Sequence, residues 1–193
     1  MNDNSSRLVS LVLLGWLCVA VGLSRWFYRA TAPAVAATVW TLTALVLLAC
    51  WQIPPVRACA LTISVRWLML LHVTRLFAGG YFLVLCRLGE LPCGFAKPAG
   101  WGDIVVAVLT LAVVGAMRTK HAKKVLLLWS TLGLIDIIFV VFSALRFGLA
   151  DWQAMHALRE LPLSLLPTFL VPIIIASHIL IFVKLARAGH QLR

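Results

Sequence analysis

The sequence has few acidic residues and few charges of any kind. Only six of its 193 residues are Asp or Glu, and charged residues make up 12% of the chain against 63% hydrophobic residues. A soluble domain of this length could not keep so much apolar surface away from water, because too few polar residues remain to cover it. The composition therefore predicts an integral membrane protein that is surrounded by a lipid bilayer and has no separate soluble domain.

Metal-binding and enzyme motifs are also missing. The five cysteines show no metal-ligand spacing, and the sequence has no H-E-x-x-H, histidine-box cluster, paired-aspartate motif, G-x-S-x-G or phosphate-binding glycine loop. These absences argue against an enzyme. The net charge of +11 comes from 17 Lys and Arg residues that mostly flank apolar stretches. This placement is typical of topology signals and lipid-headgroup contacts, and it argues against nucleic acid as a partner.

Six apolar stretches, each long enough to cross a bilayer, fill most of the chain. Prolines mark most of the joins between them, and Pro167 and Pro172 predict a kink in the last one. The pattern predicts an all-α, polytopic helix bundle that forms a single transmembrane domain over residues 1–193. Its expected spans are about 8–26, 34–53, 60–86, 103–117, 125–146 and 163–185.

Basic residues between the spans set the expected orientation. The strongest signal is a loop with four of them, Arg118, Lys120, Lys123 and Lys124. Cytoplasmic loops of membrane proteins are enriched in Lys and Arg, so six spans place both termini in the cytoplasm. Cys86 and Cys93 then border a loop on the other side. A disulfide between them and two free thiols are both compatible with the spacing.

Arg75 and Asp136 stand near the middle of the third and fifth spans. A charge at the centre of a bilayer costs about 2.5–3.5 kcal/mol even on the lenient insertion scales, so such side chains usually face protein and pair. We expect these two residues to lie at similar depth and to form an ion pair. Two interpretations stay open: a structural pair that fixes how two helices dock, and a functional gate, proton relay or anion anchor.

Helical spacing adds polar residues to the same interior. His72 lies three residues before Arg75, His178 and Thr168 share a face of the last span, and Asp103 opens the fourth span. Asp103 is interpreted either as a helix N-cap or as a member of the polar site. His72 and His178 also permit a haem interpretation, since two histidines on facing helices can ligate one iron. We expect the site between the third and sixth spans, open toward the outer face.

Two strings, LPCGFAKPAGWGD at 91–103 and LLWSTLGLIDI at 127–137, resemble a pattern found in uncharacterised bacterial multi-span membrane proteins. The resemblance covers the chain from Arg75 to the end of the last span. It implies a multi-pass protein of the bacterial inner membrane and no particular activity. It also implies that the 91–103 loop, Arg75 and Asp136 belong to one feature.

The leading functional hypothesis is a small membrane protein that binds or moves a small solute, an ion or a proton. Arg75 then holds negative charge, Asp136 sets the protonation or pairing state, and His72 and His178 extend the path inward. Because six spans are few for a carrier that acts alone, this hypothesis favours a homo-oligomer. The alternatives are a non-catalytic subunit or assembly factor of a larger membrane complex, and a haem-bearing electron carrier.

Overall fold

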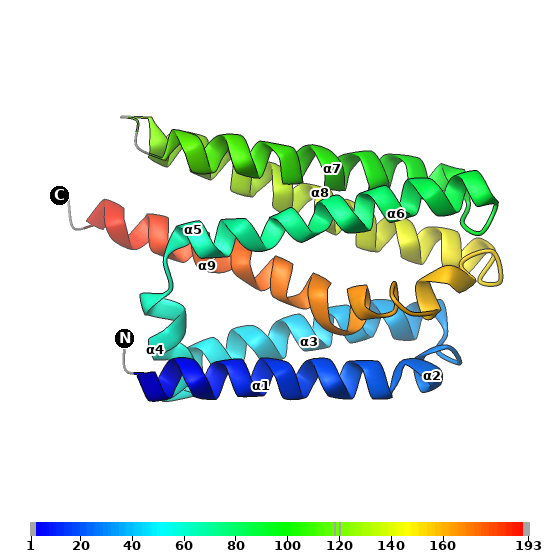
Figure 1. Ribbon diagram of the computed structural model, residues 1–193, viewed down its shortest axis with the longest axis horizontal. Helices are drawn as coiled ribbons and strands as arrows, with labels where there is room; N and C mark the ends of the chain where they lie inside the picture. Colours follow the sequence, from blue (N-terminus) through cyan, green and yellow to red (C-terminus); the bar gives the residue numbers. More distant parts are fainter. Residues whose placement is uncertain (1–2, 118, 120, 191–193) are drawn as a thin grey trace.

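The computed structural model describes residues 3–117, 119 and 121–190, and every regular element among them is a helix (Figure 1). Arg118 and Lys120, on which the expected orientation partly rests, lie outside the described residues. The helices are α1 (Asp3–Gly22), α2 (Ser24–Phe27), α3 (Ala32–Gln52), α4 (Pro54–Thr62), α5 (Val65–Leu70), η1 (Leu71–Val73), α6 (Thr74–Leu88), α7 (Cys93–Ala116), α8 (Ala122–Ala150), η2 (His156–Arg159), η3 (Leu166–Leu170) and α9 (Val171–His190).

Five helical stretches are long and apolar enough to cross a bilayer. They are Ala32–Gln52, Val65–Leu88, Cys93–Ala116, Ala122–Ala150 and Leu166–Arg187. The apolar part of α1, Val9–Gly22, is shorter than the roughly 20 residues that a span requires. The predicted all-α bundle of membrane-spanning helices is therefore confirmed as a class, whereas the sixth span and the placement of the termini stay predictions.

The spanning helices follow the long axis of the molecule, with α1 and α3 on one side and α7 and α8 on the other (Figure 1). The continuous stretch α5–η1–α6 and helix α9 lie between them. α1 begins and α9 ends at the same end of the bundle, which also holds α4; we call it the terminal end. The opposite end holds α2, the turn between α6 and α7 and the segment 151–165; we call it the loop end.

Proline and glycine set several of the helix boundaries. Pro33 and Pro54 stand in the first turns of α3 and α4, where a missing N–H costs no helical hydrogen bond. Gly89 ends α6 with a φ of 77°, a left-handed conformation that glycine adopts without steric penalty. The π-helical turn η3 contains Pro167 and forms the start of the last span, at the place where proline predicts an irregularity.

The fourth span is longer than the sequence predicts. α7 begins at Cys93, whereas the Gly and Pro content favours a loop up to residue 102 and a helix from 103. Pro98 lies inside this helix and gives up one backbone hydrogen bond close to the helix start, which membrane helices tolerate. Burial offsets this cost, because three side chains around the proline are 0% exposed, Phe95, Ala96 and Ala99.

A disulfide and several polar contacts hold the loop end together. A disulfide joins Cys86 at the end of α6 to Cys93 at the start of α7. Arg159 ties the segment 151–165 to the link between α2 and α3: its guanidinium lies 4.9 Å from the ring centroids of Tyr28 and Trp152. The same guanidinium donates hydrogen bonds to the carbonyl oxygens of these two residues. The loop end is therefore fixed by covalent and polar contacts as well as by packing.

Candidate functional site

Arg75 lies near the middle of the stretch Val65–Leu88, and its side chain is 1% exposed. Its Nε donates a hydrogen bond to Asp103 Oδ1 at 2.6 Å. Its two terminal nitrogens donate to Asp136 Oδ2 and, at 3.2 Å, to the carbonyl oxygen of Gly133. The expected pairing of Arg75 with Asp136 is present, and Asp103 is a second partner. We call Arg75, Asp103 and Asp136 the ion cluster.

The charges of the ion cluster do not balance. The Asp103 side chain is 4% exposed and the Asp136 side chain 19% exposed, so water reaches little of either carboxylate. A guanidinium keeps its proton in proteins, so a single positive charge faces two carboxylates. If both were ionised, an excess negative charge would lie in the middle of the bundle, where unpaired charge is costly. A proton or another cation bound at the cluster removes that excess.

Glycines bring the three helices close enough for these contacts. A Cβ added to Gly79 of α6 would overlap the carbonyl oxygen of Gly100 in α7, and a Cβ on Gly100 would lie 2.8 Å from the carbonyl oxygen of Gly79. Gly102 faces the carboxylate of Asp136 in the same way, so a larger residue there would displace it. Small residues at helix contacts are typical of membrane bundles, and here they position the charged side chains.

His72 lies in η1, one helical turn before Arg75, and is fully buried. Its Nε2 is 2.9 Å from Ser177 Oγ in α9, and the Ser177 hydroxyl donates to the carbonyl oxygen of Ile174 at 2.7 Å. Because the only hydroxyl proton goes to Ile174, the proton of the His72–Ser177 bond belongs to the histidine. Nδ1 is then an acceptor, and it has no hydrogen-bond partner among the described residues.

His178 of α9 lies against His72, with ring centroids 4.2 Å apart. Its Nδ1 is 3.0 Å from Ser130 Oγ in α8. The ring of Trp129 lies 5.0 Å from that of His72 and 5.4 Å from that of His178. In the described part of the chain, neither His178 Nε2 nor Trp129 Nε1 has a hydrogen-bond partner. We call His72, Trp129 and His178 the ring cluster.

The ring cluster adjoins the ion cluster on the side of the terminal end. Gly133 connects them, because a Cβ added there would lie 2.9 Å from His178 Nε2, and its carbonyl oxygen accepts from Arg75. Each buried polar atom that lacks a partner costs about 1–3 kcal/mol of desolvation. Three such nitrogens gathered in one place are the pattern expected where binding or chemistry uses them.

Apolar side chains close the polar site toward both ends of the bundle. On the loop side the interior is filled by a cluster that includes Phe82, Phe95, Val140 and Ile174. On the terminal side it is filled by a second cluster that includes Leu68, Met69, Leu126 and Ile181. The predicted opening toward the outer face stays a prediction, and on the loop side it would have to pass the first of these clusters.

The structure brings together five of the six predicted site residues, all except Thr168. Thr168 lies in η3, where its hydroxyl donates to the carbonyl oxygen of Ser164 at 2.7 Å and its own carbonyl oxygen accepts from Trp16 of α1. Thr168 thus lies in the π-helical turn at the start of the last span, and these hydrogen bonds connect it to Ser164 and Trp16 rather than to either cluster. Asp103 lies inside α7 and is not an N-cap.

Ser130 and Ser177 belong to the site although the sequence does not single them out. Ser130 is the hydrogen-bond partner of His178 Nδ1, and Ser177 is the partner of His72 Nε2. Serine is frequent in membrane helices as a small packing residue, so its presence carries little information. The usable signal is position, since Ser177 directly precedes His178 and Ser130 follows Trp129.

The ring cluster does not fit a haem. A bis-histidine haem needs the iron and the porphyrin plane between the two imidazoles. The rings of His72 and His178 are instead in contact, with centroids 4.2 Å apart, and His72 Nε2 is already bonded to Ser177. Within the described chain, no group of three or more His, Cys, Asp or Glu residues could hold a metal ion either.

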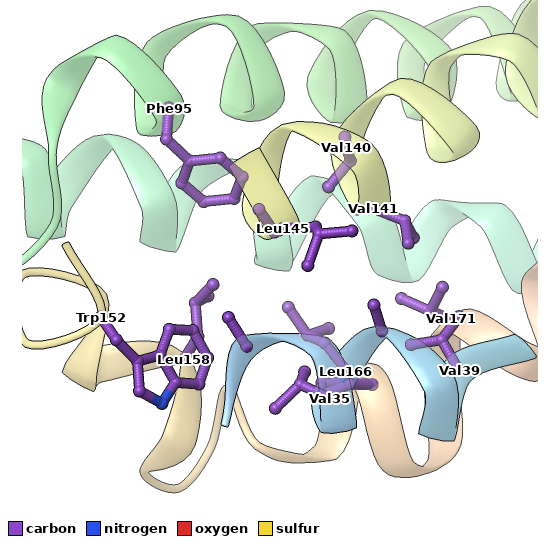
Figure 2. Close-up of a pocket in the computed structure, with 14 residues that line it drawn as sticks. Val35, Val39, Phe95, Val140, Val141, Leu145, Trp152, Leu158, Leu166 and Val171 are labelled. Carbon is purple, nitrogen blue, oxygen red and sulfur yellow. The ribbon is translucent and has the colours of Figure 1, made fainter. Parts of the chain in front are cut away.

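Two cavities of the bundle lie away from the ion cluster. The smaller, of about 60 Å³, lies between α3, α7, α8 and the last span near the loop end. Figure 2 shows apolar side chains around it, among them Phe95, Val140, Trp152 and Val171. A small apolar cavity of this kind can stay dry and offers no polar group to a ligand. The larger is a groove of about 640 Å³ between α1, α3, α4, α5 and α9.

The fold and the site together define the class of this chain: a helix bundle built to span a membrane, with a buried polar site halfway along its helices. It belongs to the family described as "Domain of unknown function (DUF8737)", which matches residues 32–186. The match covers every residue of the ion and ring clusters and excludes α1 and α2. No protein with a curated description and no solved structure matches the chain.

Proposed function

We propose that this protein binds and exchanges a proton at the ion cluster, in the middle of the membrane. The observation that carries the proposal is the placement of one guanidinium between two carboxylates. A single proton shared by Asp103 and Asp136 makes the cluster neutral, which is the least costly state for a group that is removed from water. Loss of that proton leaves a net negative charge at the same place.

The depth and packing of the cluster favour a proton over a larger cargo. Arg75, Asp103 and Asp136 lie near the centres of the second, third and fourth spanning stretches. Carboxyl groups at such positions in membrane helices typically take part in proton or ion pathways. A proton needs no cavity of its own, and the two apolar clusters fill the interior between the ion cluster and both ends of the bundle.

The ring cluster supplies the next groups along a path. A neutral imidazole can accept a proton at one nitrogen and release it from the other. His178 lies beside Gly133, to which Arg75 is bonded, and His72 lies against His178. The proposed path leads from the ion cluster through His178 and His72 toward Ser177 and the terminal end. The enclosed structure corresponds to an occluded state, which has to admit water at each end for exchange.

We place the protein in a bacterial inner membrane as a homo-oligomer, with α1 as a sixth span and the terminal end in the cytoplasm. Two features support this orientation. Lys123 and Lys124 lie in the first turn of α8 at the terminal end, as expected for a cytoplasmic boundary. The disulfide between Cys86 and Cys93 lies at the loop end, as expected for an oxidising compartment.

A second candidate function, a non-catalytic subunit of a larger membrane complex, is favoured by the surface around Asp136. This carboxylate is 19% exposed at the centre of α8, and its neighbours Ile135 and Phe139 are 60% and 47% exposed. Lipid cannot hydrogen-bond the exposed part of a carboxylate, whereas a polar group on a partner helix can. This function predicts stable co-purification with another membrane protein and no proton exchange.

Infrared difference spectroscopy on protein in vesicles tests the proton site. The measurement follows the carbonyl band of protonated carboxyl groups while the pH is raised. We expect a band that disappears with rising pH and is missing from both Asp103→Asn and Asp136→Asn, because one carboxylate balances Arg75 without a proton. Glu160→Gln is the control, since Glu160 is an exposed carboxylate outside the ion cluster. The same band in all four proteins would show that the cluster holds no exchangeable proton.

A flux measurement separates exchange from a structural ion cluster. Vesicles that contain the protein and a pH-sensitive dye are given a membrane potential, and proton entry is recorded. We expect Asp136→Asn to abolish the flux while the helical content and membrane insertion of the protein are retained. Loss of insertion or assembly in Asp136→Asn, together with no flux in the parent protein, would instead assign the cluster a purely structural role.

A further inference from the structure

The larger groove is lined by apolar side chains and is open along its length. Its volume of about 640 Å³ lies within the usual range of ligand-binding sites. The single polar lining residue is Ser177, whose hydroxyl is already bonded to His72 and Ile174. Val12 on α1 and Leu45 on α3 are each 54% exposed, so the walls of the groove open to the surroundings of the bundle. The groove therefore suits a hydrocarbon chain that enters from the side.

The length and position of the groove match one leaflet of a bilayer. Along α3 its lining runs from Leu42, halfway along the helix, to Ile53 at the terminal end. At about 1.5 Å per residue this is roughly 16 Å, close to half of the ~30 Å hydrocarbon core of a bilayer. α4 and the residues that flank it close the groove at the terminal end, with the side chains of Ile53, Val56 and Ile63. The groove thus spans the depth of a single lipid tail.

Positive charge surrounds the end of the groove at α4. Lys184 lies one helical turn beyond the lining residue Leu180 and donates one hydrogen bond, at 2.8 Å, to the carbonyl oxygen of Leu61. Two of its three N–H donors are left for another acceptor. Arg57 is exposed on α4, and the segments 53–71 and 173–187 contain no acidic residue. This rim is complementary to a phosphate group at the level of lipid headgroups.

From these features we infer that the groove binds one acyl chain of an anionic phospholipid, with the lipid phosphate at Lys184 and Arg57. The lipid belongs to the leaflet at the terminal end. A bound chain replaces the contacts that an apolar surface loses when no atoms pack against it. The groove adjoins the proposed proton path at Ser177, which bonds to His72. The inference does not depend on the proton site, because the proposed chain and headgroup contacts involve no residue of either cluster.

Protection of cysteine thiols tests the site without altering the protein. Cys50 and Cys59 line the groove, whereas Cys18 is exposed on α1 and does not. Protein in detergent is treated with N-ethylmaleimide, with and without added phosphatidylglycerol, and the labelled positions are read by mass spectrometry. We expect the lipid to slow labelling of Cys50 and Cys59 about tenfold and to leave Cys18 unchanged. Equal labelling of all three thiols with and without lipid would overturn the inference.

Native mass spectrometry with matched variants tests the occupant and its headgroup. Ala49 lines the groove and Ala44 of the same helix does not, so Ala49→Trp fills the space that Ala44→Trp leaves free. We expect Ala49→Trp to lose the lipid that the parent protein and Ala44→Trp retain. Lys184 and Arg57 should each contribute about 1 kcal/mol of attraction to an anionic headgroup, so phosphatidylglycerol should bind about 30-fold more tightly than phosphatidylcholine. Lys184→Gln removes one of the two contributions and should lower that ratio about fivefold.

Retention of lipid by Ala49→Trp at the parent level would show that the chain lies elsewhere. A preference for phosphatidylglycerol that Lys184→Gln leaves unchanged would show that the rim does not hold the phosphate. If Ala49→Trp does not fold, the thiol protection in the unaltered protein still gives the answer.

Discussion

The contact between α6 and α7 makes a sharp prediction about two adjacent glycines. Gly79 faces α7, where an added Cβ would overlap the carbonyl oxygen of Gly100 and would lie 3.0 Å from Asp103 Cβ. Gly80 points away, and an added Cβ there would meet no atom within 4 Å. Gly79→Ala and Gly80→Ala therefore make the same chemical change one residue apart, with opposite consequences for packing. Both are expected to insert in the membrane.

The expected cost follows from the distances. Ordinary contact of a Cβ atom begins at 3.4 Å, so α6 and α7 must separate by about 1 Å to admit an alanine at Gly79. The 2.6 Å bond from Arg75 to Asp103 then lengthens beyond hydrogen-bond range. Overpacking of this kind costs about 1–3 kcal/mol, and the weakened ion pair adds to it. We expect Gly79→Ala to lose about 3 kcal/mol, and Gly80→Ala to gain up to about 1 kcal/mol from helix propensity.

Unfolding in mixed micelles measures this difference. The fraction of sodium dodecyl sulfate in a mild detergent is raised, and helix content is followed by circular dichroism for the parent protein and both variants. Gly79→Ala should unfold at a clearly lower fraction than the parent, and Gly80→Ala at the same or a higher one. Identical midpoints for the two variants would refute the close approach of α6 and α7 and the account of how the ion cluster is positioned.

Three further predictions use the same unfolding assay. Arg75→Gln leaves two carboxylates without a cation and should lower the free energy of unfolding by about 3–5 kcal/mol. Replacing Asp103 and Asp136 by Asn in the same protein should restore part of this loss, and strictly additive losses would contradict the charge argument. Reduction of the disulfide between Cys86 and Cys93 should lower the free energy of unfolding by about 2 kcal/mol, because the disulfide closes only a short loop of the chain; unchanged unfolding would contradict this. Arg159→Lys should lose about 1–3 kcal/mol locally and speed hydrogen exchange in 151–165, and unaltered exchange there would count against the link.

The helical fold is predictable from the sequence because the bilayer restricts which backbone structures can cross it. Backbone N–H and C=O groups in a bilayer must form hydrogen bonds within their own helix, so the length and hydropathy of a segment locate most spans. The start of α7 was missed because glycine and proline usually mark loops, while the burial of Phe95 and its neighbours depends on contacts with α6 that no local pattern contains. The packing on both sides of the polar site is not predictable from local pattern for the same reason, since it depends on side chains from segments far apart in the sequence.

The polar site was accessible in part. Arg75 and Asp136 stood out because charges at mid-span have few structural solutions, and this also predicted their contact. The second carboxylate, Asp103, was ambiguous because its place at the presumed start of a helix fits an N-cap equally well. Thr168 lies apart from the other predicted residues, because it stands in the turn η3 and bonds to Ser164 and Trp16. The functional roles of these residues stay predictions.

The unequal lengths of α1 and α8 have a consequence for the surrounding membrane. The apolar part of α1, Val9–Gly22, is about 21 Å long, whereas the run of α8 between Lys124 and Arg146 is about 31 Å long, against a hydrocarbon thickness of ~30 Å. The two helices lie on different sides of the bundle (Figure 1). Hydrophobic mismatch is then confined to the flank of α1, where a short apolar helix thins the bilayer, while the bilayer keeps its ordinary thickness beside α8. A molecule of this shape bends the lipid sheet around it and is drawn to places where membrane thickness already changes.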